Sequence, residues 1–449
     1  MEDGRVKGDL TYGKVWKVIL AFVFPLLIGN LLQQTYHVAD SIIVGRFIGK
    51  EALAAVSASF FIYYFIISLV IGIGSGMTVV VAQCYGGKQY GKVQAAFSSF
   101  FIFTFIAGVV LAAVGILCPG AFFRLMKTPG EVVPEAVRYF RVYMCGTPFF
   151  VTFNSFLSIL RGMGDSKRPM VLVLSTAVLN ILLDLLFIVT FGWDLEGAAL
   201  ATVLAQGTGV LMATVYVHKR HPLLSMKRKD MRFDRRLFSR GLKIGIPTSV
   251  QQCSLSLGLL ALLGIVNLFG TDTLTAYGAA GKIDSLITQV VLTLSSAMSA
   301  FCGQHTGAGN VSRIRQGVRF AMLINLLFSA GIYGVICIFG REIMALFSTD
   351  GTVISTGYDY LLIVGAVFFL HGAMNVMNGA MRGAGDTLFA MITGIVLFWI
   401  IRVPLAWILS GYMGYKGIWL AISISITAGF LATCIYYGSG KWKRRTNID

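Results

Sequence analysis

The chain has 449 residues, of which 56% are hydrophobic and only 13% are charged. This composition excludes a soluble globular protein built around a single apolar core. The net charge of +17 would suit a nucleic-acid-binding protein. The basic residues, however, gather in the connections between long apolar runs, which is typical of a membrane protein in contact with lipid head groups.

Twelve apolar runs of membrane-spanning length follow one another along the sequence. They cover residues 15–45, 52–80, 93–118, 135–160, 169–191, 195–217, 242–269, 274–303, 316–340, 355–381, 388–410 and 416–438. We therefore expect an all-α polytopic membrane protein with twelve transmembrane helices. The first run is too long for the apolar part of a cleaved signal peptide, so we expect it to stay in the protein.

The positions of the Lys and Arg residues predict the orientation of the chain. If the N-terminus is cytoplasmic, the basic residues concentrate on the inner side, as the positive-inside rule requires. The linker at residues 218–243 contains ten of the 37, and residues 441–445 form another basic group. We expect a multi-pass protein of a bacterial-type inner (cytoplasmic) membrane, with both termini in the cytoplasm.

The first apolar run contains an acid at bilayer depth, Asp40. A carboxylate there costs roughly 2.5–3.5 kcal/mol on insertion scales, so it should face protein or water and have a function. Gln34, Tyr36 and His37 precede it and are candidates for a proton relay or for substrate contact. For His37, a histidine that only packs against its neighbours is an equally good interpretation.

The fifth and sixth runs provide further polar side chains at helical spacing. Thr176, Asn180 and Asp184 lie on one face at successive i,i+4 steps, and Thr202 and Gln206 share a face of the next run. Two carboxylates, an amide and a hydroxyl would make an oxygen-rich pocket for a proton or for a hard cation such as Na⁺.

The chain contains an internal repeat. Arg161-Gly162-Met163-Gly164-Asp165 returns as Arg382-Gly383-Ala384-Gly385-Asp386, 221 residues later. Each copy has six apolar runs, an even number, so the copies should be related by a pseudo-twofold axis along the membrane normal. We expect two six-helix lobes around a central cavity, at residues 1–217 and 242–449, joined by a basic cytoplasmic linker at 218–241.

The two copies differ where the acids lie. Asp40 falls opposite Gly258, and the counterparts of Asn180 and Asp184, near residues 401 and 405, include no acid. We therefore place the candidate ion site in the N-terminal lobe. A structural role for a single intramembrane acid is the competing interpretation.

The second lobe has its own polar residues in the tenth run. His371, Asn375 and Asn378 form a stripe that could face substrate or could bond between helices. Arg402, Lys282 and Asp284 lie in other runs, and the sequence alone assigns them no partner.

Other classes of protein fit less well. The sequence has no HExxH and no GxSxG motif, and its seven cysteines show no CxxC spacing, so we expect neither an enzyme nor a bound cofactor. A channel would need neither paired acids nor repeated lobes. A flippase for a lipid-linked precursor could share the two-lobe plan and stays as the alternative, although the runs offer few cations to hold a pyrophosphate.

Several segments together resemble one known family, the multidrug and toxic compound extrusion (MATE) transporters. They are the helix from Pro25 to Asp40, residues 44–49 and 76–83, the two Arg-Gly-x-Gly-Asp motifs, and residues 180–184. The resemblance extends over nearly the whole chain. It implies a secondary active antiporter that exports small organic cations or amphipathic drugs by alternating access, in exchange for H⁺ or Na⁺.

The resemblance also implies roles for individual residues. It assigns H⁺ or Na⁺ binding to Asp40, Asn180, Asp184 and Thr202, and it implies that the first helix bends at Pro25. Some family members place acids in helices seven and ten, which this chain does not, so it resembles the branch with its cation site in the first lobe. We expect a monomer within the lipid bilayer that binds no nucleic acid.

Overall fold

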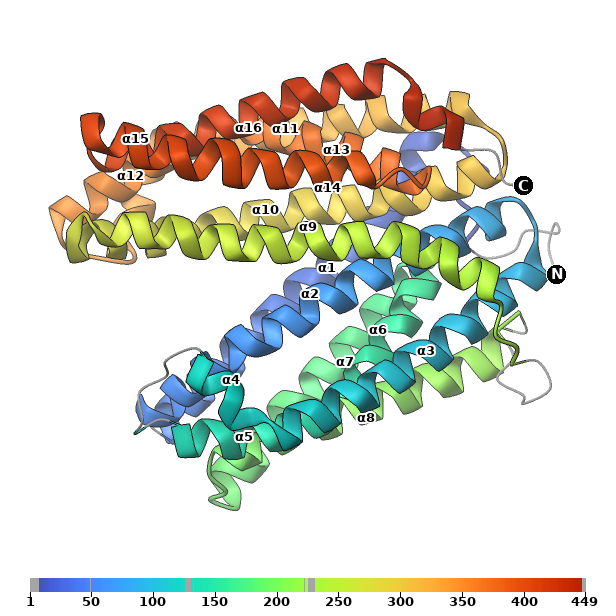
Figure 1. The fold of residues 1–449 in the computed structure, drawn as a ribbon, viewed down its shortest axis with the longest axis horizontal. Helices are drawn as coiled ribbons and strands as arrows, with labels where there is room; N and C mark the ends of the chain where they lie inside the picture. Colours follow the sequence, from blue (N-terminus) through green and yellow to red (C-terminus); the bar gives the residue numbers. More distant parts are fainter. Residues whose placement is uncertain are drawn as a thin grey trace. The chain divides into compact units, whose positions relative to one another are not determined.

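A computed structural model describes residues 8–48, 50–125, 131, 133–221, 223–224 and 231–445, and every regular element in this part of the chain is a helix (Figure 1). The first helices are α1 Val15–Phe47, α2 Lys50–Gly86, α3 Tyr90–Leu117, α4 Pro119–Leu125, α5 Val133–Cys145, α6 Thr147–Gly162, α7 Lys167–Asp184, the π-helix η1 Leu185–Thr190 and α8 Leu195–Arg220. They are followed by α9 Arg235–Asn267, α10 Gly270–Gly307, α11 Val311–Ala345, α12 Gly351–Gly365, α13 Phe368–Gly383, α14 Leu388–Ile395, the π-helix η3 Val396–Arg402, α15 Val403–Met413, α16 Tyr415–Gly438 and the short 3₁₀-helix η4 Lys441–Arg445.

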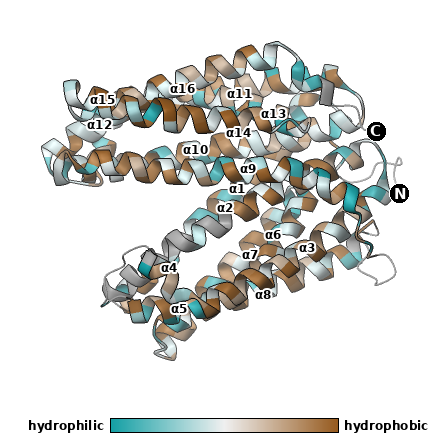
Figure 2. Cartoon of the chain, viewed as in Figure 1, coloured by the Kyte–Doolittle hydropathy of each residue, from teal (hydrophilic) through white to brown (hydrophobic). Residues whose placement is uncertain are grey.

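The chain forms a multi-pass membrane protein, as its hydropathy predicts. Within the described residues, ten helices are long and apolar enough to cross a membrane, and the number rises to twelve if each of two bent helix pairs counts as one span. The bent pairs are α5–α6, at 46°, and α12–α13, at 47°. Apolar residues follow these helices along their length (Figure 2). The twelve predicted runs thus correspond to ten helices and two bent pairs.

The chain divides into two compact units, and the division falls inside helices. The first unit contains Phe24–Ile246, and the second contains Leu10–Val23 with Pro247–Asp449. Both α1 and α9 therefore begin in one unit and end in the other, and each has a proline, Pro25 or Pro247, beside the point of division. Proline removes a backbone hydrogen bond to the preceding turn, so these are the places where the two helices bend most easily.

Close backbone contacts and aromatic rings build the core of the first unit. Phe97 on α3 and Phe156 on α6 are almost fully buried, with ring centroids 6.0 Å apart. Thr78 on α2 donates a hydrogen bond to the backbone carbonyl of Ser158 on α6, at 3.0 Å. Gly162 lies so near the Thr78 carbonyl that a Cβ there would come within 2.7 Å of it. Small residues that let helices approach are what membrane packing favours.

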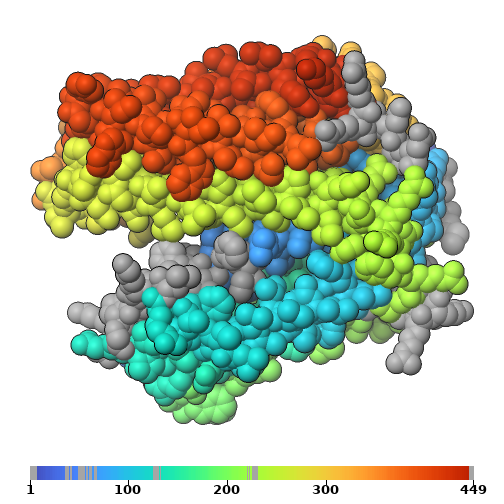
Figure 3. All heavy atoms as spheres, viewed as in Figure 1, coloured from blue at the N-terminus to red at the C-terminus, as the bar shows by residue number. Residues whose placement is uncertain are grey.

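The core of the second unit centres on Trp419 of α16, which is fully buried. The ring of Tyr277 on α10 stacks on it at 5.4 Å, and Tyr360 on α12 meets it edge-on at 4.9 Å. Figure 3 shows α14 to α16, in orange and red, on the side of this unit that is turned to the viewer. Ile400 and Trp407, 65% and 62% exposed, lie on these elements, as expected of side chains that face lipid.

The repeated Arg-Gly-x-Gly-Asp motif ends a helix in each unit. Gly164 has a φ of 81° and Gly385 a φ of 91°, the left-handed conformation that glycine adopts without strain. The amide of Asp165 then bonds back to the Leu160 carbonyl, and that of Asp386 to the Met381 carbonyl, both at 2.9 Å. This is the hydrogen-bonding of a helix end closed by glycine. The motif therefore recurs in both copies because it closes the end of a helix in each.

The aspartates of these motifs bond to the last long helix of their own units. Tyr216 on α8 donates its hydroxyl to Asp165 at 3.4 Å, and Tyr436 on α16 donates to Asp386 at 2.6 Å. The same pair of residue types thus recurs in both copies, with different geometry.

Each unit also contains a helix interrupted by a π-helical stretch. In the first unit, η1 begins immediately after Asp184. In the second unit, η3 ends at Arg402. Such stretches are rare and occur often at functional sites, because the extra residue per turn redirects side chains. In both units the interruption adjoins an ionisable residue at bilayer depth.

Candidate functional site

Two acids from distant parts of the sequence meet in the first unit. The carboxyl group of Asp40 on α1 lies within hydrogen-bonding reach of that of Asp184, the last residue of α7. Asp184 is fully buried, and neither of its oxygens accepts a hydrogen bond from a donor in the described part of the protein. Two contacting carboxylates in a medium of low dielectric constant cannot both remain charged without a proton or a cation between them.

One helical turn before Asp184, the amide of Asn180 bonds to a hydroxyl of the next helix. Asn180 on α7 donates its Nδ2 hydrogen to Thr202 Oγ1 on α8, at 3.3 Å, and both side chains are buried. This bond orients the amide so that Asn180 Oδ1 remains an acceptor, and within the described residues it has no donor. The hydroxyl of Thr202 donates to the carbonyl of Ala198 on its own helix.

The unsatisfied atoms at this place are all acceptors. They are Oδ1 of Asp40, Oδ1 of Asn180 and both carboxylate oxygens of Asp184. A buried acceptor without a donor costs about 1–3 kcal/mol, so a group of them predicts a ligand that supplies positive charge. Oxygen donors of this type suit a hard cation such as Na⁺, and a proton shared by the acids would satisfy part of the same set.

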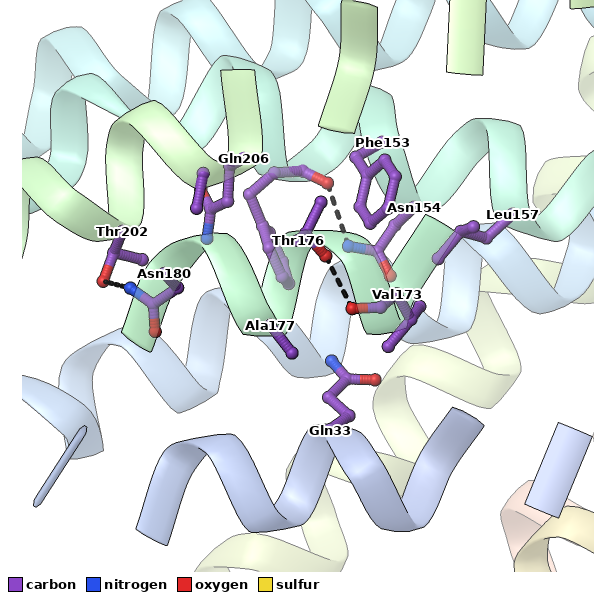
Figure 4. Close-up of a pocket in the computed structure, with 12 residues that line it drawn as sticks. Gln33, Phe153, Asn154, Leu157, Val173, Thr176, Ala177, Asn180, Thr202 and Gln206 are labelled. Carbon is purple, nitrogen blue, oxygen red and sulfur yellow. Dashed lines mark hydrogen bonds between the residues drawn. The ribbon is translucent and has the colours of Figure 1, made fainter. Parts of the chain in front are cut away.

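A small cavity adjoins Asn180 and Thr202 in the first unit (Figure 4). Counted as the space that the centres of water molecules can reach, its volume is about 40 Å³. One water needs roughly 10–15 Å³ on this measure, so the cavity has room for a few waters or an ion but not for a drug-sized molecule. Its polar lining residues come from α1, α6, α7 and α8, and they are Gln33, Asn154, Thr176, Asn180, Thr202 and Gln206.

The polar side chains of this cavity are neutral. Asn154 donates to the Phe150 carbonyl at 2.9 Å and Thr176 donates to the Val173 carbonyl at 2.9 Å, so each is held by its own helix. Gln33 points toward the cavity from α1. Uncharged amides and hydroxyls can coordinate an ion or its water without binding it tightly. Asn180 lines both this cavity and the acid site.

The structure brings together the four residues assigned to cation binding, Asp40, Asn180, Asp184 and Thr202, in one unit. Gln206, predicted as a relay or substrate contact, lines the adjoining cavity. Gln34 is exposed, one residue away from the cavity-lining Gln33. The predictions for Tyr36 and His37 fall on side chains outside the described ones. Sequence reasoning missed the cavity-lining role of Gln33 and Asn154, although Gln33 lies on the same predicted helix face as Asp40.

The polar stripe of the tenth predicted run lies on α13. Asn375 donates to the His371 carbonyl of its own helix at 2.9 Å, and its backbone carbonyl accepts the Ser295 hydroxyl of α10 at 2.7 Å. Asn378 is buried and His371 is partly exposed. These contacts leave both interpretations of the stripe, substrate contact and bonding between helices, as predictions.

The ionisable residues left without partners from the sequence now have neighbours. Arg402 donates its Nε hydrogen to Ser425 Oγ at 2.7 Å. Asp284 interacts with the Tyr360 hydroxyl and with the charge of Arg402. Lys282, two residues away, is exposed and places its ammonium group 6.0 Å from the Phe347 ring. The second unit therefore also contains an acid at bilayer depth, with a cation beside it.

Known proteins resemble this chain along nearly its whole length. The sequence profile of the family described as MatE matches it twice, at residues 25–186 and 247–408. The probable multidrug resistance protein YoeA of Bacillus subtilis (strain 168) is 31% identical over 440 residues, covering 96% of this chain and 95% of that protein. A FAD transporter of Shewanella oneidensis is 24% identical over 415 residues, covering 92% of each chain.

The fold also matches solved structures. A crystal structure of a MATE protein in a bent conformation superposes with a TM-score of 0.91 at 26% identity, covering 98% of this chain and 99% of that one. The two profile matches begin at Pro25 and at Pro247 and cover both copies of the repeat. The protein is therefore a multi-pass membrane protein that belongs to the MATE family of multidrug efflux transporters, which are not enzymes.

Proposed function

We propose that this protein is a secondary active antiporter that exports organic cations or amphipathic compounds in exchange for H⁺ or Na⁺. The observation that carries the proposal is the contact between Asp40 and Asp184, with the unsatisfied acceptor oxygens around it. The relative YoeA is named a probable multidrug resistance protein, which supports drug-like cargo.

The coupling ion acts by neutralising the acid pair. When a proton or Na⁺ binds at Asp40 and Asp184, the cost of enclosing negative charge in the membrane falls, and Asn180 Oδ1 adds a further oxygen ligand. Thr202 orients that amide. Pro25, fifteen residues before Asp40 in the helix Val15–Phe47, gives α1 a place to bend as the site closes. An ion shifts the balance between two facing states only as far as it binds one state better than the other.

Exchange follows if ion and cargo bind mutually exclusive states. An anionic site attracts a cationic compound, and neutralisation of the acids releases it to the outside. One positive charge moving inward gains about 2.3 kcal/mol per 100 mV of membrane potential, which supports export against a gradient. The 40 Å³ cavity beside Asn180 admits water or the ion, not the cargo.

The positive-inside rule predicts the orientation of the protein in the membrane. We place both termini and the basic linker in the cytoplasm, and the protein in a bacterial-type inner membrane as a monomer. The two copies of the repeat act as two lobes, of which the first holds the exchangeable ion.

Transport by purified protein in vesicles tests the proposal. A pH gradient or a Na⁺ gradient, each imposed separately, should drive accumulation of ethidium, and dye transport at fixed pH with and without Na⁺ identifies the ion. Asp40→Asn and Asp184→Asn should abolish this coupling while inserting normally in the membrane. Glu196→Gln, which removes an exposed acid at the start of α8, serves as the control.

Two results would overturn the proposal. Full gradient-driven transport in both aspartate variants would remove the acids from the coupling mechanism. Movement of a lipid-linked precursor, with no ethidium transport under any gradient, would favour the flippase alternative instead.

A further inference from the structure

The positions of the second unit that the repeat matches to Asp40 and Asp184 are not acids. The sequence pairing puts Gly258 on α9 opposite Asp40, at a shift of 218 residues, and the shift of 221 puts Ala261 there; neither is an acid. A Cβ at Gly258 would overlap the ring of Phe398 in η3. A side chain of any size is therefore excluded there while Phe398 keeps its position. The counterpart of Asp184, near residue 405, has no acid either.

A cation, Arg402, lies beside the Phe398 ring. The guanidinium group of Arg402 lies 4.3 Å from the centroid of the Phe398 ring, a cation–π geometry. Its Nε hydrogen bonds to Ser425 Oγ on α16, at 2.7 Å. Asp284 on α10 lies within electrostatic range of it, and the Tyr360 hydroxyl of α12 interacts with the Asp284 carboxyl group.

The internal repeat shows that both charges are particular to the second unit. At the shift of 221 residues, Arg402 corresponds to Ile181, and Asp284 corresponds to Tyr63. Among the described side chains, the first unit thus brings two acids together, whereas the second has one acid, Asp284, within electrostatic range of an arginine. A proton or Na⁺ can leave the first site, but a guanidinium group stays charged at all accessible pH values and is tethered to the chain.

We propose that Arg402 is a built-in cation that holds the second unit in an ion-loaded state, and that its removal uncovers a latent site for a monovalent inorganic cation at Asp284, Tyr360 and Ser425. The inference rests on the proposed ion coupling in the first unit. It explains how a duplicated protein can use one exchangeable site. The fixed charge of Arg402 permanently neutralises the acid in one lobe, whereas the acids of the other lobe are neutralised only when H⁺ or Na⁺ binds from solution.

The chemistry of the latent site suits a small hard cation. Asp284 provides a negative charge, and Ser425 and Tyr360 provide hydroxyl oxygens. The other titratable groups near Arg402 are Tyr277 on α10 and His371 on α13. Neither adds negative charge near neutral pH, so Asp284 alone balances the arginine and alone would attract its replacement.

Thermal melting of purified protein tests this inference without any transport measurement. All variants are made in an Asp40→Asn, Asp184→Asn background, so that the first unit contributes no ion binding. Melting is compared at one pH in choline chloride, NaCl and LiCl. With Arg402 present, the melting temperature should be the same in all three salts. Arg402→Gln should melt lower in choline chloride and recover with NaCl or LiCl in a saturable way.

Further variants separate the charge from the packing of Arg402. Adding Asp284→Asn to Arg402→Gln should abolish the salt response, and Arg402→Lys, which keeps the charge, should show none. The control Lys416→Gln removes a cation that pairs with Asp359 at 3.0 Å on the surface of the same unit, and it should not become salt-responsive.

The outcomes distinguish this inference from the proposed function. If Arg402→Gln melts identically in the three salts, or if its response persists after Asp284→Asn, the latent site does not exist. If Arg402→Gln does not fold in any of the three salts, the double variant Arg402→Gln, Asp284→Asn, which removes both charges, decides the question. Folding of the double variant without added cation supports the inference, and its failure to fold overturns it. Loss of gradient-driven ethidium transport in the unmodified protein would instead refute the proposed function.

Discussion

The ring of Phe398 in η3 lies directly against Gly258 in α9. Adding a methyl group at this glycine should destabilise the protein by about 1–3 kcal/mol, because the ring has to move from a packed position. Melting of Gly258→Ala measures the loss, and Phe398→Leu in the same chain should restore part of it. Gly264→Ala, in the same helix but with open space around its Cβ, should leave the melting temperature unchanged or slightly higher. An equal loss at both glycines would contradict the packing argument.

The hydrogen bond between Asn180 and Thr202 predicts a change in ion affinity. Thr202→Val keeps the shape of the side chain but leaves Asn180 free to turn away, at a cost of about 1–1.5 kcal/mol. The concentration of coupling ion that gives half-maximal transport should rise about tenfold. Thr208→Val, which removes a hydroxyl bonded only to its own helix, is the matched control. Unchanged ion dependence in Thr202→Val would separate Thr202 from the site.

The two Tyr–Asp bonds near the repeated glycine motifs should differ in strength. Asp386 is 1% exposed and accepts the Tyr436 hydroxyl at 2.6 Å, whereas Asp165 is less buried and accepts Tyr216 at 3.4 Å. Tyr436→Phe should cost about 1.5–3 kcal/mol. Tyr216→Phe also removes the 3.1 Å bond with His221 but should cost less, because both bonds of the Tyr216 hydroxyl are longer than that of Tyr436. Melting temperatures of the two single variants make the comparison, and the reverse order would show that these distances do not govern stability.

His221, after the end of α8, predicts a dependence of stability on pH. Burial away from water lowers the pKa of this imidazole below its usual value of 6.5, and Arg168 lowers it further against the opposing effect of Asp165. The unfolded chain therefore binds the proton first as the pH falls through 6.5, so acid destabilises the fold and the contribution of neutral His221 is complete only above that value. The neutral ring hydrogen-bonds with the Tyr216 hydroxyl at 3.1 Å.

Melting of His221→Gln from pH 8 to pH 5 measures this contribution. The variant should lose less stability on acidification than the unmodified protein. His218→Gln, which removes an exposed histidine of α8, should keep the original pH dependence. If the melting temperatures of the His221 variant and of the unmodified protein fall in parallel from pH 8 to pH 5, the imidazole does not cause the loss of stability in acid.

Hydropathy alone predicts the number and order of the spans, because a bilayer imposes one length on every crossing helix. It does not predict that the fourth and tenth spans bend near Gly146 and Val367, or that π-helical stretches adjoin Asp184 and Arg402. Those features depend on how neighbouring helices satisfy the backbone, which a periodic pattern does not record.

The candidate site was predictable as a set of residue types but not as a geometry. The spacing of Asn180 and Asp184 places them on one helix face, and the repeat singles out Asp40 by its loss in the second copy. That the acids touch, and that Gln33 points toward the adjoining cavity, depends on tertiary packing between α1 and α7. The pairing of Arg402 with Ser425 joins side chains 23 residues apart on different helices, and no short-range signal identifies it.

The division of the chain inside α1 and α9 has a consequence for biosynthesis. Residues 10–23 are synthesised before residues 24–246, yet they pack in the unit whose other residues, 247–449, are synthesised after them. Residues 235–246, made after the linker, complete the unit that precedes them. When the first six spans have been synthesised, residues are therefore still missing from both units. Two separately expressed fragments, divided at the linker, should become protease-resistant only when both are synthesised in the same cell.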